Sequence, residues 1–268
     1  MKRKRFLTTL SLAALFALGT ATACTPSSEE SADAGSGEDD RVLVMATSAD
    51  YPPYEFYETA EGGGEPIGFD IDIAKAITEK LGYTLEIEDM DFNGIIPALQ
   101  AERADFAMAG MTPTEERKES VDFSQIYYDA QNTIISTQGS GLAAYEDLEG
   151  KTVGVQLGSI QEGEAEEQAE TIEMTIEPRN KVSELIQEVK AGRLDAAIVE
   201  DTVAKGYVQN NEDLEFATVA IEGESGSAIA FPKGSPLAAE FDQALTELIE
   251  SGEMDALIQT WFEDYYDQ

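Results

Sequence analysis

The sequence predicts an α/β protein made of two lobes, and three observations lead to this fold class. Strand-like and helix-like segments alternate along the chain after residue 40, a pattern typical of a mostly parallel sheet covered by helices. A second series of such segments begins near Leu148. A late strand-like segment, residues 228–231, then closes the series. We therefore expect two lobes rather than one long sheet.

The first series follows the order strand, helix, strand, helix, strand. Its longest helix carries Ile73, Ala74, Ile77 and Leu81 on one face, and Gly82 marks its end. We expect strands at residues 42–47, 83–88 and 106–109, and helices at residues 70–81 and 94–102. A short helix that carries Arg117 should follow the third strand.

The second series is more acidic but has the same character. We expect strands at residues 152–156, 196–199 and 228–231, and helices at residues 159–169 and 181–191. Ser235 as the N-cap and Pro236 in the first turn then predict a C-terminal helix, which Gly252 interrupts.

The N-terminus has the features of a targeting segment. A basic stretch at residues 2–5 precedes an apolar stretch at residues 6–19, and small residues lead to Cys24, the only cysteine. We predict a lipoprotein signal peptide at residues 1–23, with Cys24 lipidated. Simple secretory cleavage after Ala23 is the alternative. Residues 24–40 are polar and acidic, so we expect a flexible linker.

Composition excludes several classes of function. The chain has 268 residues, 54 acidic and 17 basic, with no histidine and a net charge of −37. Such a field repels nucleic acid and attracts cationic solutes, although solubility in a salty or alkaline habitat is the simpler explanation. We find no glycine-rich phosphate loop and no cysteine or histidine cluster. We therefore expect no cofactor, no metal and no nucleic-acid partner.

Five motifs give the chain a family resemblance over residues 41–265. They are TSADYPPYEF at 47–56, GFDIDIAKAI at 68–77, AGMTPTEER at 109–117, VQLGSIQ at 155–161 and IVEDT at 198–202. Together they resemble the bacterial extracellular solute-binding proteins of family 3, which serve amino-acid ABC importers, and most closely the arginine-type binders of Gram-positive bacteria.

The resemblance implies a periplasmic-binding-protein-like, or Venus-flytrap, fold with two hinge crossings. It places residues 41–127 and 226–268 in lobe 1 and residues 128–225 in lobe 2. The crossings are expected near residues 127–131 and 221–225.

An α-amino acid presents a carboxylate and an ammonium group, and a buried site must pair both. Arg117 is the candidate for the carboxylate, because its planar guanidinium can donate two parallel hydrogen bonds. The resemblance implies the same role for Arg117, and Thr112 should add its hydroxyl and N–H. The alternative is a surface arginine paired with Glu115 or Asp122.

Two further groups complete the predicted recognition of the backbone of the ligand. Gly158 precedes a helix start at Ser159 and Ile160, where free N–H groups favour a carboxylate. Glu200 follows a buried strand, where open α/β sheets bind ligands, and is the candidate ammonium partner. Asp201 is the alternative, since the resemblance usually places aspartate here. The carbonyl of Gly110 is a second acceptor.

The resemblance also implies that Tyr51 and Phe92 sandwich the ligand side chain, although Phe92 could equally lie in the core. Polar candidates for specificity are Ser48, Asp50, Glu55, Gln156 and Gln161. We favour arginine or another polar or basic amino acid. The predicted ligand-binding residues are Ser48, Tyr51, Phe92, Gly110, Met111, Thr112, Arg117, Gln156, Ser159, Ile160, Gln161 and Glu200.

These features predict the substrate-binding component of an amino-acid ABC transporter. We expect a monomer, lipid-anchored at the extracellular face of the cell membrane, that delivers a free amino acid to a permease and catalyses no reaction. A sensor on the same fold is one alternative. A dehydratase acting on cyclic prephenate-type acids is the other, and it requires a proton donor such as Glu200 with a raised pKa.

Overall fold

The computed structural model describes residues 41–58, 63–220, 223 and 225–265. The predicted signal peptide, the lipidation of Cys24 and the linker at residues 24–40 lie outside the described residues. Among the described helices, none is long and apolar enough to cross a membrane.

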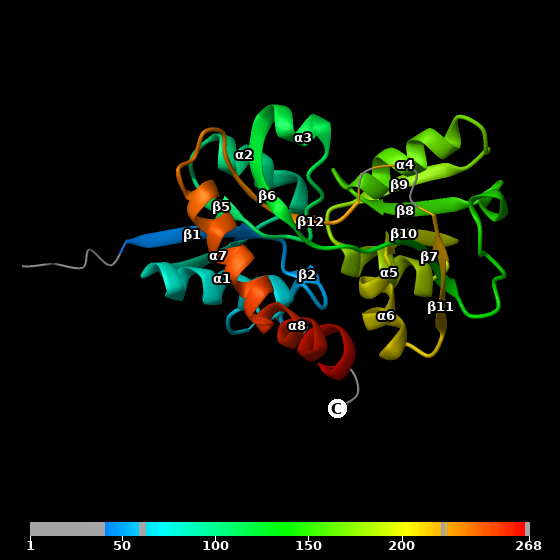
Figure 1. Ribbon diagram of the computed structural model, residues 1–268. Coiled ribbons are helices and arrows are strands. Elements are labelled where there is room, and N and C mark those ends of the chain that lie inside the picture. The colour runs from blue at the N-terminus through cyan, green and yellow to red at the C-terminus, as the bar shows by residue number, and fades with distance from the viewer. Residues whose placement is uncertain (1–40, 59–62, 221–222, 224, 266–268) are drawn as a thin grey trace, which may run out of the picture. The chain divides into compact units, whose positions relative to one another are not determined.

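The first lobe is built on a five-stranded sheet with the order β4-β1-β5-β12-β6 (Figure 1). Strand β1 runs parallel to β4 and β5, whereas β12 is antiparallel to β5 and β6. The strands are β1 (Val42–Thr47), β4 (Thr84–Asp89), β5 (Phe106–Ala107), β6 (Val121–Tyr128) and β12 (Ser227–Pro232), with a small hairpin of β2 (Asp50–Tyr51) and β3 (Glu55–Phe56).

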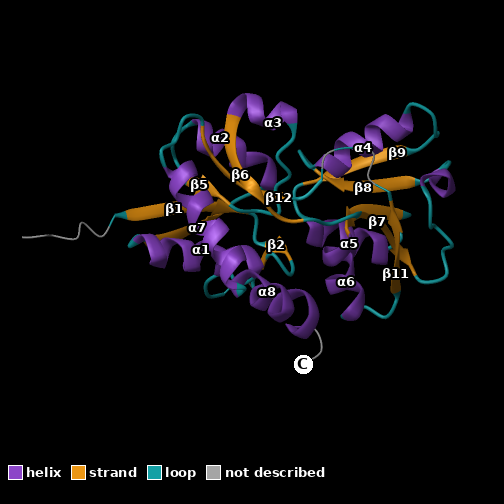
Figure 2. Ribbon diagram, viewed as in Figure 1, coloured by secondary structure: helices purple, strands orange, loops and turns teal. Residues whose placement is uncertain are grey.

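Helices from both the N-terminal and the C-terminal part of the chain pack on this sheet (Figure 2). They are α1 (Phe69–Leu81), α2 (Ile95–Gln100), α3 (Glu115–Ser120), α7 (Leu237–Ser251) and α8 (Glu253–Ile258), with a 3-10 turn η1 (Phe92–Gly94) and a terminal π-helical turn η3 (Gln259–Asp264). Ile73, Ala74 and Ile77 of α1 are fully buried, so the apolar face read from the sequence is the face that packs.

The second lobe has its own five-stranded sheet, with the order β11-β7-β10-β8-β9. Its strands are β7 (Asn132–Thr137), β8 (Thr152–Gln156), β9 (Thr175–Arg179), β10 (Ala196–Glu200) and β11 (Leu214–Val219). Its helices are α4 (Ile160–Ala169), α5 (Val182–Lys190) and α6 (Asp201–Gln209), with a 3-10 turn η2 (Tyr145–Leu148). Strand β10 is buried along its length, which explains its continuous apolar run.

The chain passes between the two sheets twice, and the two-lobe α/β fold is therefore confirmed. Strand β6 ends at Tyr128 and β7 begins at Asn132, and the return path joins Val219 to Ser227. Tyr128 pairs with Ser227 inside the first sheet, so the expected boundary between residues 127 and 128 falls one residue before the end of β6. Of the second expected crossing, residues 221, 222 and 224 lie outside the described residues.

Some local expectations were wrong. The helix expected at residues 94–102 is present but shorter, since α2 spans Ile95–Gln100 and Gly94 belongs to the preceding 3-10 turn η1. The strand expected at residues 106–109 ends at Ala107, because the chain turns there toward Gly110, whose φ is 55°. Helix α7 begins at Leu237, so Pro236 precedes its first residue instead of lying in its first turn. The Ser235 hydroxyl still accepts a hydrogen bond from the N–H of Leu237 at 3.3 Å.

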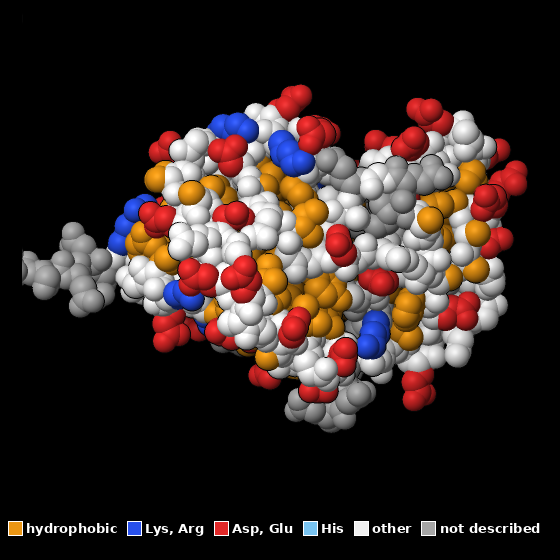
Figure 3. Space-filling view, in the orientation of Figure 1, with side chains coloured by type: hydrophobic (Ala, Val, Ile, Leu, Met, Phe, Trp, Pro, Cys, Tyr) orange, Lys and Arg blue, Asp and Glu red, His pale blue; other side chains and the backbone are white. Residues whose placement is uncertain are grey.

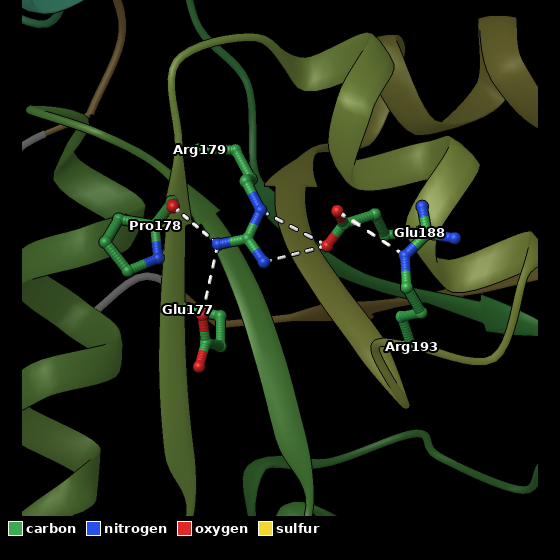
Figure 4. Close-up of polar contacts among 5 residues, drawn as sticks. All are labelled: Glu177, Pro178, Arg179, Glu188 and Arg193. Atoms are coloured by element: carbon green, nitrogen blue, oxygen red, sulfur yellow. Dashed lines mark hydrogen bonds and ion pairs between the residues drawn. The ribbon is translucent and has the colours of Figure 1, made fainter.

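A charged network joins β9 to α5 at one side of the second lobe (Figure 4). Arg179 donates to Glu188 from Nε at 3.2 Å and Nη2 at 2.9 Å, and from Nη1 to Glu177 at 3.1 Å. Arg193 contacts the same Glu188 at 3.6 Å. The carbonyl of Arg179 accepts from Leu157 N at 2.9 Å, so this network supports the strand beside the loop that leads into α4.

Gly68 allows the first lobe to close around the turn at residues 51–54. Its φ of 137° is a backbone conformation that residues with a side chain rarely adopt. A Cβ there would lie 2.1 Å from the carbonyl oxygen of Tyr54. The close approach lets Asp70 N donate to that same carbonyl oxygen at 2.9 Å. The glycine therefore fixes how α1 starts against this turn.

We expect Gly68→Ala to lower the free energy of unfolding by at least about 3 kcal/mol, because backbone strain and a backbone clash add. Gly82→Ala is the matched control, since φ is 75° but no atom lies within 4 Å of the added Cβ. It should cost only about 1–2 kcal/mol. Urea denaturation measures both; equal losses would contradict the role of Gly68.

Candidate functional site

A small cavity of about 20 Å³ lies between the two sheets, where the loops after their parallel strands meet. Its lining residues are Tyr51, Phe92, Ala109, Gly110, Thr112, Arg117, Gln156, Ser159, Ile160, Gln161 and Glu200. Ten of these are predicted ligand-binding residues, and Ala109 is the addition. Ser48 and Met111 do not line this cavity. A larger hollow of about 560 Å³ shares Phe92, Arg117, Ser159 and Ile160 with it.

Arg117 extends from the short helix α3 across to the second lobe. Its Nη1 donates to the carbonyl of Thr112 at 2.8 Å and its Nη2 to the carbonyl of Gly158 at 2.9 Å. The guanidinium carbon also lies 5.4 Å from the centre of the Phe92 ring. Burial lowers the pKa of Arg117 to about 10, so it stays charged at neutral pH. A guanidinium has five N–H donors, which leaves donors for an anion.

The surface-pairing alternative for Arg117 does not describe this structure. Glu115 pairs with Lys118 at 2.8 Å, and Asp122 pairs with Lys233 at 2.8 Å. Arg117 instead has two carbonyl oxygens as its hydrogen-bond partners. Its positive charge therefore has no hydrogen-bonded carboxylate among the described residues.

The start of α4 lies on the opposite side of the cavity. The Ser159 hydroxyl caps the helix by accepting from Glu162 N at 3.1 Å. Ser159 N donates to the carbonyl of Gln156 at 3.1 Å. This N–H, which was expected to bind a ligand, is therefore already used within the protein. The N–H groups of Ile160 and Gln161 have no helical partner, because the residues four positions earlier precede the helix. These two groups favour an anion.

Glu200 ends β10, is buried, and lines the cavity. Its Oε1 accepts from the Tyr54 hydroxyl and from Thr202 Oγ1, the latter at 2.7 Å. Burial raises the pKa of Glu200 to about 8, against the hydrogen bonds from Tyr54 and Thr202 that lower it. Asp201 points to the backbone instead, accepting from Thr202 N at 2.9 Å and Gln131 N at 3.3 Å. Of these two acids, only Glu200 lines the cavity.

A pair of buried acids supports the turn at Gly110. Asp70 accepts from Gly110 N at 2.9 Å and from the Tyr127 hydroxyl at 2.8 Å. Burial raises the pKa of Asp70 to about 6. As a carboxylate, Glu55 would have no donor for either oxygen, and burial followed by the charge of Asp70 raises its pKa well above the ordinary value. Both causes favour the protonated form of Glu55.

Aromatic rings form two of the cavity walls. Tyr51 and Phe92 are both largely buried, and Tyr51 stacks on Tyr54 with centroids 5.7 Å apart and an interplanar angle of 28°. A Cβ at Gly110 would lie 3.1 Å from Cε1 of Tyr51. The glycine therefore permits the backbone turn and the aromatic wall to occupy adjacent space.

Of the five polar candidates for specificity, Glu55 is buried and does not line the cavity, and the other four fall into two groups. Gln156 and Gln161 line the cavity, and Gln161 Nε2 donates to Asn132 Oδ1 at 2.8 Å. Ser48 instead donates to Asp50 at 3.2 Å, and Asp50 accepts from Ser183 N of the second lobe at 3.3 Å. Asp50 thus joins the two lobes, and Ser48 supports its carboxylate.

Sequence reasoning missed Tyr54, Asp70 and Thr202 as parts of this site. Asp70 offered a usable signal, because an acid within the buried face of α1 needs donors. Tyr54 offered none, since its partner Glu200 is 146 positions away.

The chain belongs to the bacterial extracellular solute-binding proteins, family 3, whose model matches residues 43–264. A curated relative is the arginine-binding extracellular protein ArtP of Bacillus subtilis. It is 47% identical over 234 residues, which cover 87% of this chain and 90% of that protein.

Two solved structures have the same fold. An ancestral arginine-binding protein bound to arginine has 40% identity and a TM-score of 0.77, covering 82% of this chain and 98% of that chain. The amino-acid ABC transporter substrate-binding protein AbpA of Streptococcus pneumoniae, bound to L-arginine, has 38% identity and a TM-score of 0.76, covering 84% and 94%.

The raised pKa of Glu200 predicts a pH-dependent cost to the ligand-free protein. Folded Glu200 binds its proton more tightly than the unfolded chain does, so its contribution to stability falls as pH rises from about 4.5 to about 8. Glu200→Gln should remove this decline and gain on the order of 2–5 kcal/mol relative to the unsubstituted chain between pH 4.5 and 8.

Urea denaturation at a series of pH values measures this difference. Glu86→Gln, at an exposed position of β4, is the control and should show no such trend. A difference between Glu200→Gln and the unsubstituted chain that stays constant with pH would show that Glu200 is not proton-linked in this way.

Proposed function

We propose that this protein binds a free L-amino acid, with arginine as the ligand, as the substrate-binding component of an amino-acid ABC transporter. One observation carries the proposal: Arg117 and Glu200 line the same small cavity, each without a hydrogen-bonded partner of opposite charge among the described residues. An α-amino acid supplies a carboxylate for the first and an ammonium group for the second.

The preference for arginine is supported by the walls of the cavity and by the relatives. Aromatic faces such as those of Tyr51 and Phe92 attract cations, and the acidic surface in Figure 3 favours cationic solutes over anionic ones. ArtP and AbpA, named above, are described by their binding of arginine. Gln156 and Gln161 provide amide oxygens that a guanidinium can use.

We also propose the setting in which the protein acts. The family is extracellular, and lipidation of Cys24 would hold a monomer at the outer face of the cell membrane beside its permease. Ligand binding would favour the arrangement in which the lobes touch. Arg117 to Gly158 and Asp50 to Ser183 are contacts of this arrangement, and no bond of the ligand is broken.

The dehydratase alternative is supported by one feature, the pKa of Glu200 near 8, since such a group could donate a proton. An ammonium site without its cation has the same property, because a buried carboxylate there is uncompensated. The curated relative and the solved neighbours described above are binding proteins, which favours binding. Turnover of a cyclic prephenate-type acid, lost in Glu200→Gln, would support the alternative.

Arg117→Ala should weaken L-arginine binding by about thirtyfold to a thousandfold, because a buried charged hydrogen-bond partner of the carboxylate is lost. Arg117→Lys should recover only part of this, since lysine cannot form the planar pair. Isothermal titration calorimetry measures the affinities. Arg103→Ala, at an exposed arginine, should bind normally. Agmatine, which is arginine without its carboxylate, should bind equally to both alanine variants; selective loss of agmatine binding would assign Arg117 to another group of the ligand.

Binding should also release protons at pH 7. Glu200 is largely protonated there before binding, because its pKa is about 8, and a paired ammonium group lowers that pKa. We expect release of up to about one proton per arginine, and an affinity that rises with pH until about pH 8. Calorimetry in buffers of different ionisation enthalpy counts the protons. Release of the same number by Glu200→Gln would assign them to another group.

A further inference from the structure

We propose that the Tyr54 hydroxyl group is a positioning group that acts across the cleft and holds the Glu200 carboxylate ready for the ammonium group of the ligand. The inference rests on the proposed function and adds a residue from the opposite lobe to it. Tyr54 lies between β2 and β3 of the first lobe, whereas Glu200 ends β10 of the second. The hydroxyl donates directly to Glu200 Oε1, and β2 lies beside α5 of the second lobe in Figure 1.

The hydrogen bonds to Glu200 are divided unequally between its two oxygens. Oε1 accepts from both Tyr54 and Thr202. Oε2 has no hydrogen bond to any described residue, and the side chain lines the cavity. The two donors therefore orient the carboxylate and leave Oε2 as the acceptor for a cation. A glutamate has three side-chain torsions to restrict, so two donors on one oxygen are an effective constraint.

The Tyr54 ring is itself immobilised, which makes its hydroxyl a preorganised donor. It is fully buried and packs edge-on against Phe69, Tyr128 and Phe262, with centroids 6.1, 5.9 and 5.2 Å away. Tyr51, a wall of the cavity, stacks on its other side. A donor fixed by such packing loses little further freedom when it bonds.

Its position in the opposite lobe gives this hydrogen bond a second consequence. Glu200 can accept the hydrogen bond from the Tyr54 hydroxyl only when the two lobes are in contact. Thr202, from the same lobe as Glu200, provides the other donor in either arrangement. The ammonium site is thus completed by lobe closure, which couples recognition of the α-ammonium group to that movement.

Tyr54→Phe in the full chain tests this role, because it keeps the ring and removes only the donor. The ligands are L-arginine and its desamino analogue, in which hydrogen replaces the α-ammonium group. We expect Tyr54→Phe to weaken L-arginine binding about ten- to a hundredfold and to change binding of the analogue by less than about threefold. Tyr83→Phe is the matched control, since it removes an exposed tyrosine–carboxylate bond, to Glu240, within the first lobe.

A second variant provides an independent test if Tyr54→Phe lowers the melting temperature too far for binding to be measured. Glu200→Asp shortens the side chain and withdraws it from Tyr54, so it should reproduce the loss for L-arginine. In the double variant, Tyr54→Phe should then add less than about threefold to the loss.

The outcomes separate the two claims. Equal weakening of both ligands by Tyr54→Phe would show a general structural effect and overturn the positioning role, as would unchanged L-arginine affinity. Failure of the unsubstituted chain to bind L-arginine would overturn the proposed function itself. Weakening confined to L-arginine, with Tyr83→Phe unaffected, supports the role of Tyr54.

Discussion

The burial of three acidic side chains, two within the first lobe and one at the cavity, is the constraint on which the rest of the site depends. Glu55, Asp70 and Glu200 are almost completely buried, and no salt bridge joins any of them to a basic residue in the described part of the chain. Isolated buried carboxylates cost several kcal/mol. The protein reduces this cost with donors to Asp70 from Gly110 and Tyr127, and with hydroxyl donors at Glu200. A bound ammonium group would offset the remainder.

The fold makes this arrangement possible by bringing the ends of strands from two sheets together. Arg117 follows the turn after β5, and Glu200 ends β10. Each is held by a neighbour in the sequence. The carbonyl of Thr112 accepts a hydrogen bond from Arg117, and the Thr202 hydroxyl donates one to Glu200. Gly110 and Gly158, both with positive φ, provide the tight turns that bring backbone to the cavity. Rigid lobes thus place a guanidinium and a carboxyl group at fixed positions on the same cavity, which is what discrimination of an amino acid requires.

Much of the fold and many of the residues that line the cavity could be predicted from the sequence, because apolar spacing and capping residues are local signals. Helix α1 was evident from the spacing of Ile73, Ala74 and Ile77, and the start of α4 from Ser159. The strands β6, β7, β9 and β11 were not predicted. In β6, β9 and β11 buried and exposed positions do not alternate over a clear apolar pattern, and β7 is almost wholly buried but has only two apolar residues, Ile134 and Ile135.

The contacts that define the site in three dimensions were beyond sequence reasoning for a physical reason. Tyr54 meets Glu200, and Tyr127 meets Asp70, only after both sheets have formed and the chain has crossed between them. Nothing in the residues near Tyr54 indicates that its hydroxyl needs a distant carboxylate. The motif residues could be placed near one another by family resemblance, but the proton balance among the buried acids depends on packing.

A crystal structure of the complex with L-arginine would test the central claim most directly. We expect the carboxylate of the ligand to lie against Arg117 and the N–H groups of Ile160 and Gln161, with its ammonium group on Glu200 Oε2 and its side chain between Tyr51 and Phe92. Arginine bound with its carboxylate away from Arg117, or outside the cavity that Glu200 lines, would contradict the assignment of these two charges.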